Sequence, residues 1–256
     1  MIYVEKRHTA IFWKSELSGF LQMIIKFDKQ FMGPPGHVHG GYAGGSLCDE
    51  LFGRCSVSFK HPIPLNKDLE IEKYQGKNIL KGQNGILLEA CEDPDAELFT
   101  TPVAPPTIDK AYLAGSKMPT IKSGDLHANC YCCDSQSSDR ALGIAVGPYD
   151  SSAQGWFSGV WTPQSQFLGD LNHATIWAAL DCPGWRVWQE LENIGPCYLV
   201  HMTTQVDHML EDGEPHIIMA GPLAGSTGRK RWSGVALFTA DGLCVAKARQ
   251  LWVIPQ

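Results

Sequence analysis

A glycine-rich segment with two histidines leads into a cysteine and two adjacent acids. It runs from Gly33 to Leu51 and reads GPPGHVHGGYAGGSLCDEL. Glycines let the backbone approach a ligand closely, and the first N–H groups of a helix can hold an oxyanion or a polarised carbonyl. Acids further along can serve as general base or nucleophile, although the same residue types also occur in turns, cores and solvated helix faces. The catalytic candidates are Asp49, Glu50 and His39, of which His39 also shapes the loop.

Strand patterns surround this segment in the first half of the chain. We expect a strand in Phe20–Phe31, then the glycine loop, then a helix at about residues 42–53. Further strand-like runs are expected at Ser56–Phe59, Asp68–Tyr74, Asn78–Cys91 and Glu97–Val103.

The second half repeats that order. A strand-like stretch at Gly155–Trp161 precedes a helix from about Ala174 to Leu180, which Pro183-Gly184 is expected to interrupt. Each half is expected to end in a hairpin, with turns at Glu92-Asp93-Pro94-Asp95 and Ala240-Asp241-Gly242. The repeated order favours a duplication. The remaining strands are expected at Tyr198–Val206, His216–Gly221, Arg231–Thr239 and Cys244–Val253.

Proline and glycine divide the chain near its middle. The expected organisation is an N-terminal unit of residues 1–105, a linker of residues 106–125 and a C-terminal unit of residues 126–256. A strand, a central apolar helix and a run of antiparallel strands favour an α+β unit, because such a helix needs the inner face of a sheet to bury it. Two such units would pair side by side.

These motifs resemble those of known proteins over most of the chain. His39-Gly40-Gly41, followed by a small-residue helix bearing Asp49-Glu50, resembles the hot-dog fold thioesterases, particularly the phenylacetate-pathway type of acyl-CoA thioesterase. The resemblance implies a double hot-dog, with two antiparallel sheets each wrapped around a central helix. The second half is similar to bacterial double hot-dog proteins at residues 130–133 (CYCC), 161–163 (WTP), 176–184 (IWAALDCPG), 228–230 (GRK) and 236–238 (ALF).

The resemblance also implies an active site between the two units. The helix start around Gly40 and Gly41 would polarise a thioester carbonyl, and Asp49 or Glu50 would activate water. The pantetheine arm would run between the units. The stretch before the second helix lacks paired glycines, so one competent site is expected. Contributions from across the interface are expected from Asn172, His173 or Asp181.

One departure from the family pattern concerns the register of the acid. The familiar acid follows the motif histidine by nine residues, but here that position is Cys48 and the acids follow at Asp49 and Glu50. Each one-residue step rotates a helical side chain by about 100°. Either an extra loop residue restores the register, or Cys48 itself faces the site, as a nucleophile or as a small apolar filler.

Three further residues are candidates for substrate binding. Tyr42 follows the paired glycines, and Trp177 lies near the second helix, where tryptophans could line an acyl pocket. Arg229 belongs to a short basic patch that could meet the phosphates of coenzyme A or of a carrier protein's phosphopantetheine, although such a hairpin tip is more often only solvated.

The leading functional hypothesis is a thioesterase acting on an acyl-CoA or an acyl-carrier protein. One alternative keeps the acyl-thioester pocket but replaces hydrolysis by a dehydration, isomerisation or cyclisation of a polyketide-like or acyl intermediate in biosynthesis. A second alternative is a non-catalytic protein that binds an acyl ligand. A monomer or a homodimer is expected.

Composition excludes other classes of protein. A formal charge of −6 lacks the basic excess that nucleic-acid binding draws on, and no apolar run is long enough for a membrane span or an export signal. The expected location is the cytoplasm. The nine cysteines show no disulfide framework and are expected as reduced thiols. Because the CYCC cluster has no second ligand pair at a comparable spacing, and His37-x-His39 has no third ligand, we expect no metal site and no cofactor.

Overall fold

A computed structural model of the chain describes residues 2–6, 9–15, 21–48, 53–119, 128–134, 140–149, 155–164 and 173–256. The elements of the first half are β1 (Ile2–Lys6), β2 (Thr9–Ser15), β3 (Leu21–Phe27), the 3₁₀ turn η1 (Lys29–Phe31), α1 (Gly40–Cys48), β4 (Arg54–Phe59), β5 (Leu69–Tyr74), β6 (Lys77–Gly82) and β7 (Gly85–Glu92). Those that follow are α2 (Ile108–Gly115), β8 (Gly147–Pro148), β9 (Phe157–Trp161), α3 (His173–Glu192), β10 (Tyr198–Val206), β11 (His216–Pro222), β12 (Lys230–Phe238) and β13 (Cys244–Val253).

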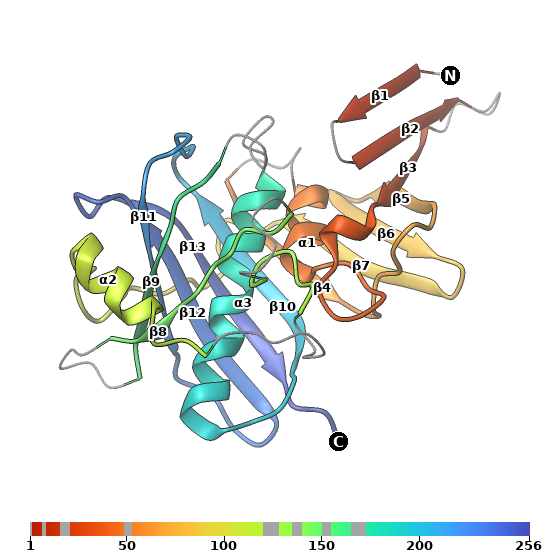
Figure 1. Cartoon of the computed structure of the whole chain (residues 1–256). Helices are drawn as coiled ribbons and strands as arrows, with labels where there is room; N and C mark the ends of the chain where they lie inside the picture. Colours follow the sequence, from red (N-terminus) through yellow and green to blue (C-terminus); the bar gives the residue numbers. More distant parts are fainter. Residues whose placement is uncertain are drawn as a thin grey trace.

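The described strands form one continuous antiparallel sheet of 13 strands, in the order β1-β2-β3-β5-β6-β7-β4-β10-β13-β12-β11-β9-β8 (Figure 1). The expectation of two separate sheets is therefore wrong in this respect. The two halves join where β4 pairs with β10, and the Ser56 and Thr203 hydroxyl oxygens lie 2.8 Å apart across that pair. An unpaired sheet edge exposes a row of N–H and C=O groups, and pairing two edges satisfies both rows.

Both halves arrange their strands in the same way. The order β3-β5-β6-β7-β4 in the first half corresponds to β9-β11-β12-β13-β10 in the second. Each half also places a helix, α1 or α3, between its first strand and the remaining four. The repeated order of elements that the sequence indicates is thus present in the sheet.

Helices α1 and α3 pack against each other, α1 over strands of the first half and α3 over strands of the second (Figure 1). The glycines of α1 make this close approach possible. A Cβ atom on Gly41 would lie 2.5 Å from the carbonyl oxygen of Trp177, and one on Gly45 would lie 2.6 Å from the Cα of Ala174. Among the described helices, none is both long enough and apolar enough to cross a membrane.

Helix α3 runs through Pro183-Gly184, so the prediction that this pair interrupts the helix is wrong. Proline has no N–H and disturbs the helical hydrogen bonds around it. Gln250 of β13 supports the helix next to the proline, because its Nε2 donates to the carbonyls of Leu180 at 2.6 Å and Asp181 at 3.1 Å. A Cβ atom on Gly184 would collide with the Gln250 side chain, which leaves room only for glycine.

Other local expectations differ in detail. The run Asn78–Cys91 is split by a turn into β6 and β7. Glu97–Val103 forms no strand, so the prediction of a first hairpin around Glu92-Asp93-Pro94-Asp95 is wrong. Instead Phe99 packs beside Trp156, with ring centroids 6.1 Å apart. Trp156 belongs to a small hydrophobic cluster that is separate from the main core. The second hairpin is confirmed, since β12 and β13 pair around the turn at 240–242. Helix α2 lies inside the range expected as a linker.

Candidate functional site

A carboxylate from the second half lies at the start of α1. The backbone N–H of Gly41 donates to Oδ2 of Asp181 at 2.6 Å, and both residues are buried. The N-terminus of a helix carries a partial positive charge that favours an anion. Nδ1 of His39 lies 3.5 Å from the same oxygen and 3.4 Å from the N–H of Tyr42. Residues of both halves therefore build one site.

The second oxygen of this carboxylate differs from the first in its surroundings. Oδ1 of Asp181 is buried and has no hydrogen-bond partner among the described residues. Leaving a buried acceptor unsatisfied costs free energy, so such atoms usually have a ligand, a water or a functional role. This oxygen can accept a proton from a water molecule or a substrate.

Burial and charge act in opposite directions on the histidine and the acid. Burial raises the pKa of Asp181, and the nearby His39 and the N–H of Gly41 oppose that rise only in part. Burial by itself would lower the pKa of His39, but the Asp181 carboxylate and the Cys130 thiol raise it to about 9. The two groups therefore form one buried pair, in which each group influences the pKa of the other.

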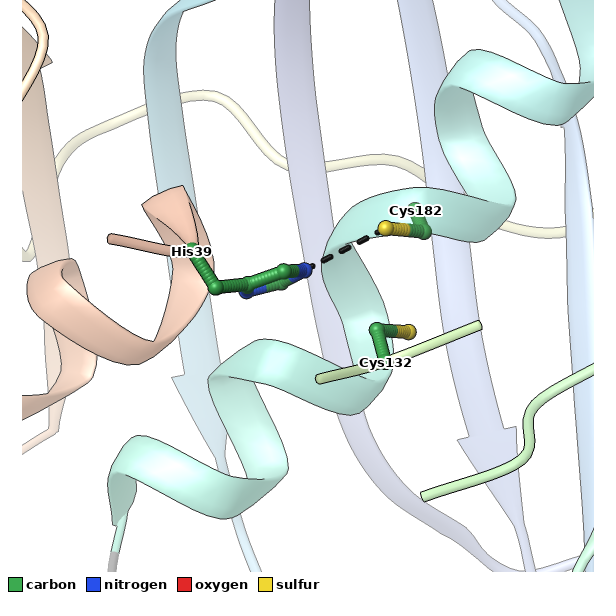
Figure 2. A group of neighbouring side chains, drawn as sticks. All are labelled: His39, Cys132 and Cys182. Atoms are coloured by element: carbon green, nitrogen blue, oxygen red, sulfur yellow. Dashed lines mark hydrogen bonds between the residues drawn. The ribbon is translucent and has the colours of Figure 1, made fainter. Parts of the chain in front are cut away.

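The other ring nitrogen of His39 faces cysteines. Nε2 lies 3.2 Å from Sγ of Cys182, and Cys132 lies beside this contact (Figure 2). The Cys130 sulfur lies 3.7 Å from that of Cys182 and 3.3 Å from that of Cys133. All four thiols are buried. Burial raises the pKa of Cys132, but hydrogen bonds with Cys133 and Cys182 lower it to about 7.

Apolar side chains flank the outer side of the α1 start. Gly40 is only partly buried, and a Cβ atom placed on it would lie 3.3 Å from Leu199 of β10 and 3.7 Å from Phe59 of β4. Both neighbours are themselves only partly buried. The junction of β4 and β10 thus presents apolar groups next to the first amide of α1.

Tyr42 and Trp177 lie in the core. The Tyr42 ring stacks on Phe31, with centroids 3.8 Å apart, and meets Tyr131 edge-on at 5.3 Å. Trp177 is 1% exposed and lies against Gly44 of α1. In the described residues Trp177 packs α3 against α1, whereas Tyr42 packs α1 against Phe31 and Tyr131.

The remaining candidates are spread over the molecule. Cys48 ends α1, about 12 Å along the axis from Gly40, and is buried beside Cys55. His173 begins α3, and its Nδ1 has no hydrogen-bond partner among the described residues. Arg229 is exposed in the β11–β12 connection and donates to the carbonyl of Ile254 at 3.4 Å. The candidates that lie outside the described residues are Asp49, Glu50 and Asn172.

Two features of the site were not inferred from the sequence. One is Gln250, which holds the backbone of α3 at Asp181. The other is the convergence of His39 and Cys182 with the CYCC segment. The sequence does contain a signal for this convergence, because Cys182 directly follows the site candidate Asp181. Cys182 and the CYCC segment lie far apart in the sequence, however, so their spacing does not indicate a shared site.

Comparison with known proteins gives a result only at the level of structure. No protein-family model matches this sequence, and no curated protein matches it either.

Solved structures resemble the chain over nearly its whole length. The tesB protein of Mycobacterium avium subspecies paratuberculosis is 11% identical, with a TM-score of 0.61 over 92% of this chain and 93% of that one. The acyl-CoA thioesterase II TesB2 of Mycobacterium marinum is 8% identical, with a TM-score of 0.55 over 91% and 93%. The pyran synthase domain from module nine of the sorangicin pathway is 13% identical, with a TM-score of 0.54 over 99% and 100%. The chain therefore has a double hot-dog fold, structurally like TesB-type acyl-CoA thioesterase II proteins over about 92% of its length.

Proposed function

We propose that the protein is an acyl thioester hydrolase in which Asp181 is the general base. The observation that carries this proposal is the buried Asp181 carboxylate, held through Oδ2 by the N–H of Gly41 while Oδ1 has no partner among the described residues. Oδ1 takes a proton from water as the water oxygen attacks the thioester carbonyl. The carbon–sulfur bond then breaks, and the proton passes from Asp181 to the departing thiolate.

The thioester carbonyl is placed at the first amide of α1. Since the N–H of Gly41 already binds Asp181, the N–H of Gly40 is the donor that polarises the carbonyl oxygen, with the helix dipole behind it. Leu199 and Phe59 flank this position and supply an apolar contact for the substrate. The substrate is an acyl-CoA or an acyl-carrier protein, and Arg229 is proposed to meet its phosphates.

Thiol release from acyl-CoA thioesters tests the proposal. The panel is acetyl, hexanoyl, palmitoyl, benzoyl and phenylacetyl-CoA. Asp181→Asn keeps an oxygen that can accept from Gly41 but removes the base, so we expect a loss of kcat of about 100-fold or more. Asp68→Asn, an exposed carboxylate at the start of β5, is the matched control and should retain full activity. Full activity in Asp181→Asn would refute the assignment.

Parallel variants test the acids and the thiol that the sequence singles out. Asp49→Ala, Glu50→Ala and Cys48→Ala are assayed on the same panel. With Asp181 as base, each should retain most of the activity. A loss confined to Asp49→Ala or Glu50→Ala would move the base to that residue, and a loss in Cys48→Ala would support a thiol nucleophile.

A non-hydrolytic reaction is a second candidate, favoured by the pairing of His39 with Asp181 across the two halves. An imidazole and a carboxylate at this distance can remove one proton and return another, as a dehydration or cyclisation requires. The likeness to a pyran synthase domain is compatible with such chemistry. Incubation with a β-hydroxyacyl thioester separates the candidates, because dehydration yields an unsaturated thioester and releases no thiol. If neither product forms and an acyl ligand is retained through purification, the protein is a binder.

A further inference from the structure

We infer that His39, Cys182 and the thiols of Cys130, Cys132 and Cys133, here called the thiol cluster, bind one zinc ion. Hydrolysis as proposed above uses none of these groups, so this inference does not rest on the proposed function. Zinc in proteins prefers thiolate sulfur and imidazole nitrogen in tetrahedral sets of four. The thiol cluster offers four sulfurs and one nitrogen, which is one ligand more than a zinc ion needs.

Two sulfur–sulfur separations within the thiol cluster are close to those of zinc ligands, and each of two groups supplies three neighbouring ligand atoms. Sulfur ligands at about 2.3 Å from a tetrahedral zinc lie about 3.8 Å from one another. The Cys130 and Cys182 sulfurs are 3.7 Å apart, and Cys130 and Cys133 are 3.3 Å apart. Two groups have all ligand atoms within 4.8 Å of one another: His39, Cys132 and Cys182, and Cys130, Cys133 and Cys182. Cys182 belongs to both groups, so it is the central ligand.

The second nitrogen of His39 has the partner that a zinc-bound histidine needs. Histidines that bind a metal through one nitrogen commonly donate the other N–H to a carboxylate, which sets the tautomer and the ring orientation. Nε2 of His39 faces the Cys182 sulfur at 3.2 Å (Figure 2). Nδ1 lies 3.5 Å from Oδ2 of Asp181. When Nε2 binds zinc, the ring proton lies on Nδ1, which then donates to Asp181 instead of accepting from the N–H of Tyr42.

Backbone hydrogen bonds hold the CYCC segment in place, although it is neither helix nor strand. The N–H of Tyr131 donates to the carbonyl of Met32 at 2.7 Å, and the N–H of Ile144 donates to the carbonyl of Cys132 at 2.9 Å. These bonds bring three thiols to the point where His39 precedes α1 and Cys182 lies in α3. A zinc ion here joins three segments that are remote in the sequence.

Zinc also accounts for the burial of so many thiols in mutual contact. A buried cysteine usually behaves as a small apolar group. In the thiol cluster the sulfurs instead contact one another and an imidazole. When zinc binds, each thiol that becomes a ligand loses its proton to solvent, His39 binds as the neutral imidazole, and no electron is transferred.

The first test is the metal content of the purified full-length chain. Elemental analysis of protein expressed with added zinc should find roughly one zinc per chain. After removal by a chelator, Co²⁺ should restore about one equivalent and give the visible bands of a tetrahedral site with thiolate-to-cobalt charge transfer. These measurements use the unaltered protein, so they do not depend on whether a variant folds.

Variants then identify the ligands. Cys182→Ser and His39→Gln should each abolish stoichiometric binding of zinc. Among the three single serine variants of the CYCC cysteines, two should also abolish it and one should leave it intact, because one of the three thiols is not a ligand. Cys55→Ser is the control, because Cys55 is buried outside the thiol cluster and should leave zinc content unchanged.

Two results would overturn the inference. The first is wild-type protein that binds neither Zn²⁺ nor Co²⁺ while all nine thiols react in denaturant. The second is a mass and thiol count that show a disulfide within the thiol cluster in the isolated protein. Acyl-CoA hydrolysis is measured separately, so an inactive protein that contains zinc would refute the proposed function and leave the zinc site standing.

Discussion

Gly41 serves the site through its backbone and through its lack of a side chain. Its N–H holds the Asp181 carboxylate at 2.6 Å. Its Cα faces α3 so closely that a Cβ would lie 2.5 Å from the Trp177 carbonyl oxygen and 2.8 Å from the Cβ of Asp181. Since the first of these neighbours is backbone, it cannot rotate away. The proposed catalysis and the packing of the two helices therefore depend on the same residue.

Gly41→Ala is expected to destabilise the protein by about 1–3 kcal/mol, the usual cost of overpacking a close contact. It should also reduce thiol release, because α3 and with it Asp181 must move. Urea unfolding measures the first effect and the acyl-CoA assay the second. Gly195→Ala is the control, since nothing lies within 4 Å of a Cβ there, and its midpoint should equal that of the wild type. Equal midpoints for both variants would contradict the packing argument.

At the scale of elements, α3 depends on a strand that lies far from it in the sequence. Pro183 lies inside the helix, and Gln250 of β13 donates to the carbonyls of Leu180 and Asp181. Oε1 of Gln250 accepts from the indole N–H of Trp252 at 3.0 Å. One fully buried amide thus holds the helix at the position of the proposed base.

Gln250→Met should lower the free energy of unfolding by about 2–4 kcal/mol, because it removes two buried donations to carbonyls of α3 and the acceptor of the buried Trp252 indole N–H. Methionine has a similar length, so loss of volume is a minor contribution. Chemical denaturation followed by circular dichroism gives the value. Gln83→Met, in the exposed β6–β7 turn, should change stability by less than about 0.5 kcal/mol. A similar small change at Gln250 would show that the helix does not need this support.

At the scale of the whole molecule, the two halves share a sheet and a helix interface. The guanidinium of Arg54 in β4 donates to Oε1 of Gln205 in β10 at 3.0 Å and 2.8 Å, next to the paired hydroxyls of Ser56 and Thr203. The glycines of α1 pack against Trp177 and Ala174 of α3. Separation of the halves would expose both surfaces to water.

The chain should therefore unfold as one cooperative unit. Of the eight tryptophans only Trp13 precedes residue 105, so tryptophan fluorescence reports mainly on the second half, whereas far-UV circular dichroism reports on both. We expect the two urea curves to coincide, as two-state unfolding requires. A circular dichroism curve with an additional step that fluorescence lacks would show that the halves unfold independently.

Patterns among neighbouring residues correctly predicted several strands and one turn, which are determined mainly by local interactions. β4, β5, β10 and β13 lie within a residue or two of their expected ranges, and the turn at 240–242 lies where Asp241-Gly242 indicates it. The alternation of apolar residues in strands and the preference for certain residues in turns each depend on a few neighbouring positions. Both are therefore visible in the sequence. Glu97–Val103 has a strand-like composition, yet it forms no strand. It packs against the second half instead, where the Phe99 ring contacts Trp156.

By itself the sequence determined the strand and helix periodicity, the repeated order of elements and the glycines ahead of α1. Only the tertiary structure decided what those glycines contact, because Gly41 and Asp181 lie 140 positions apart and their hydrogen bond exists only once α1 and α3 have packed. The same holds for the thiol cluster, in which His39 and Cys182 are 143 positions apart. Contacts between such distant residues produce no regular spacing in the sequence, because the length and composition of the intervening chain do not determine them. The tertiary structure also decided that the strands of the two halves join through β4 and β10, because this pairing depends on which two sheet edges meet.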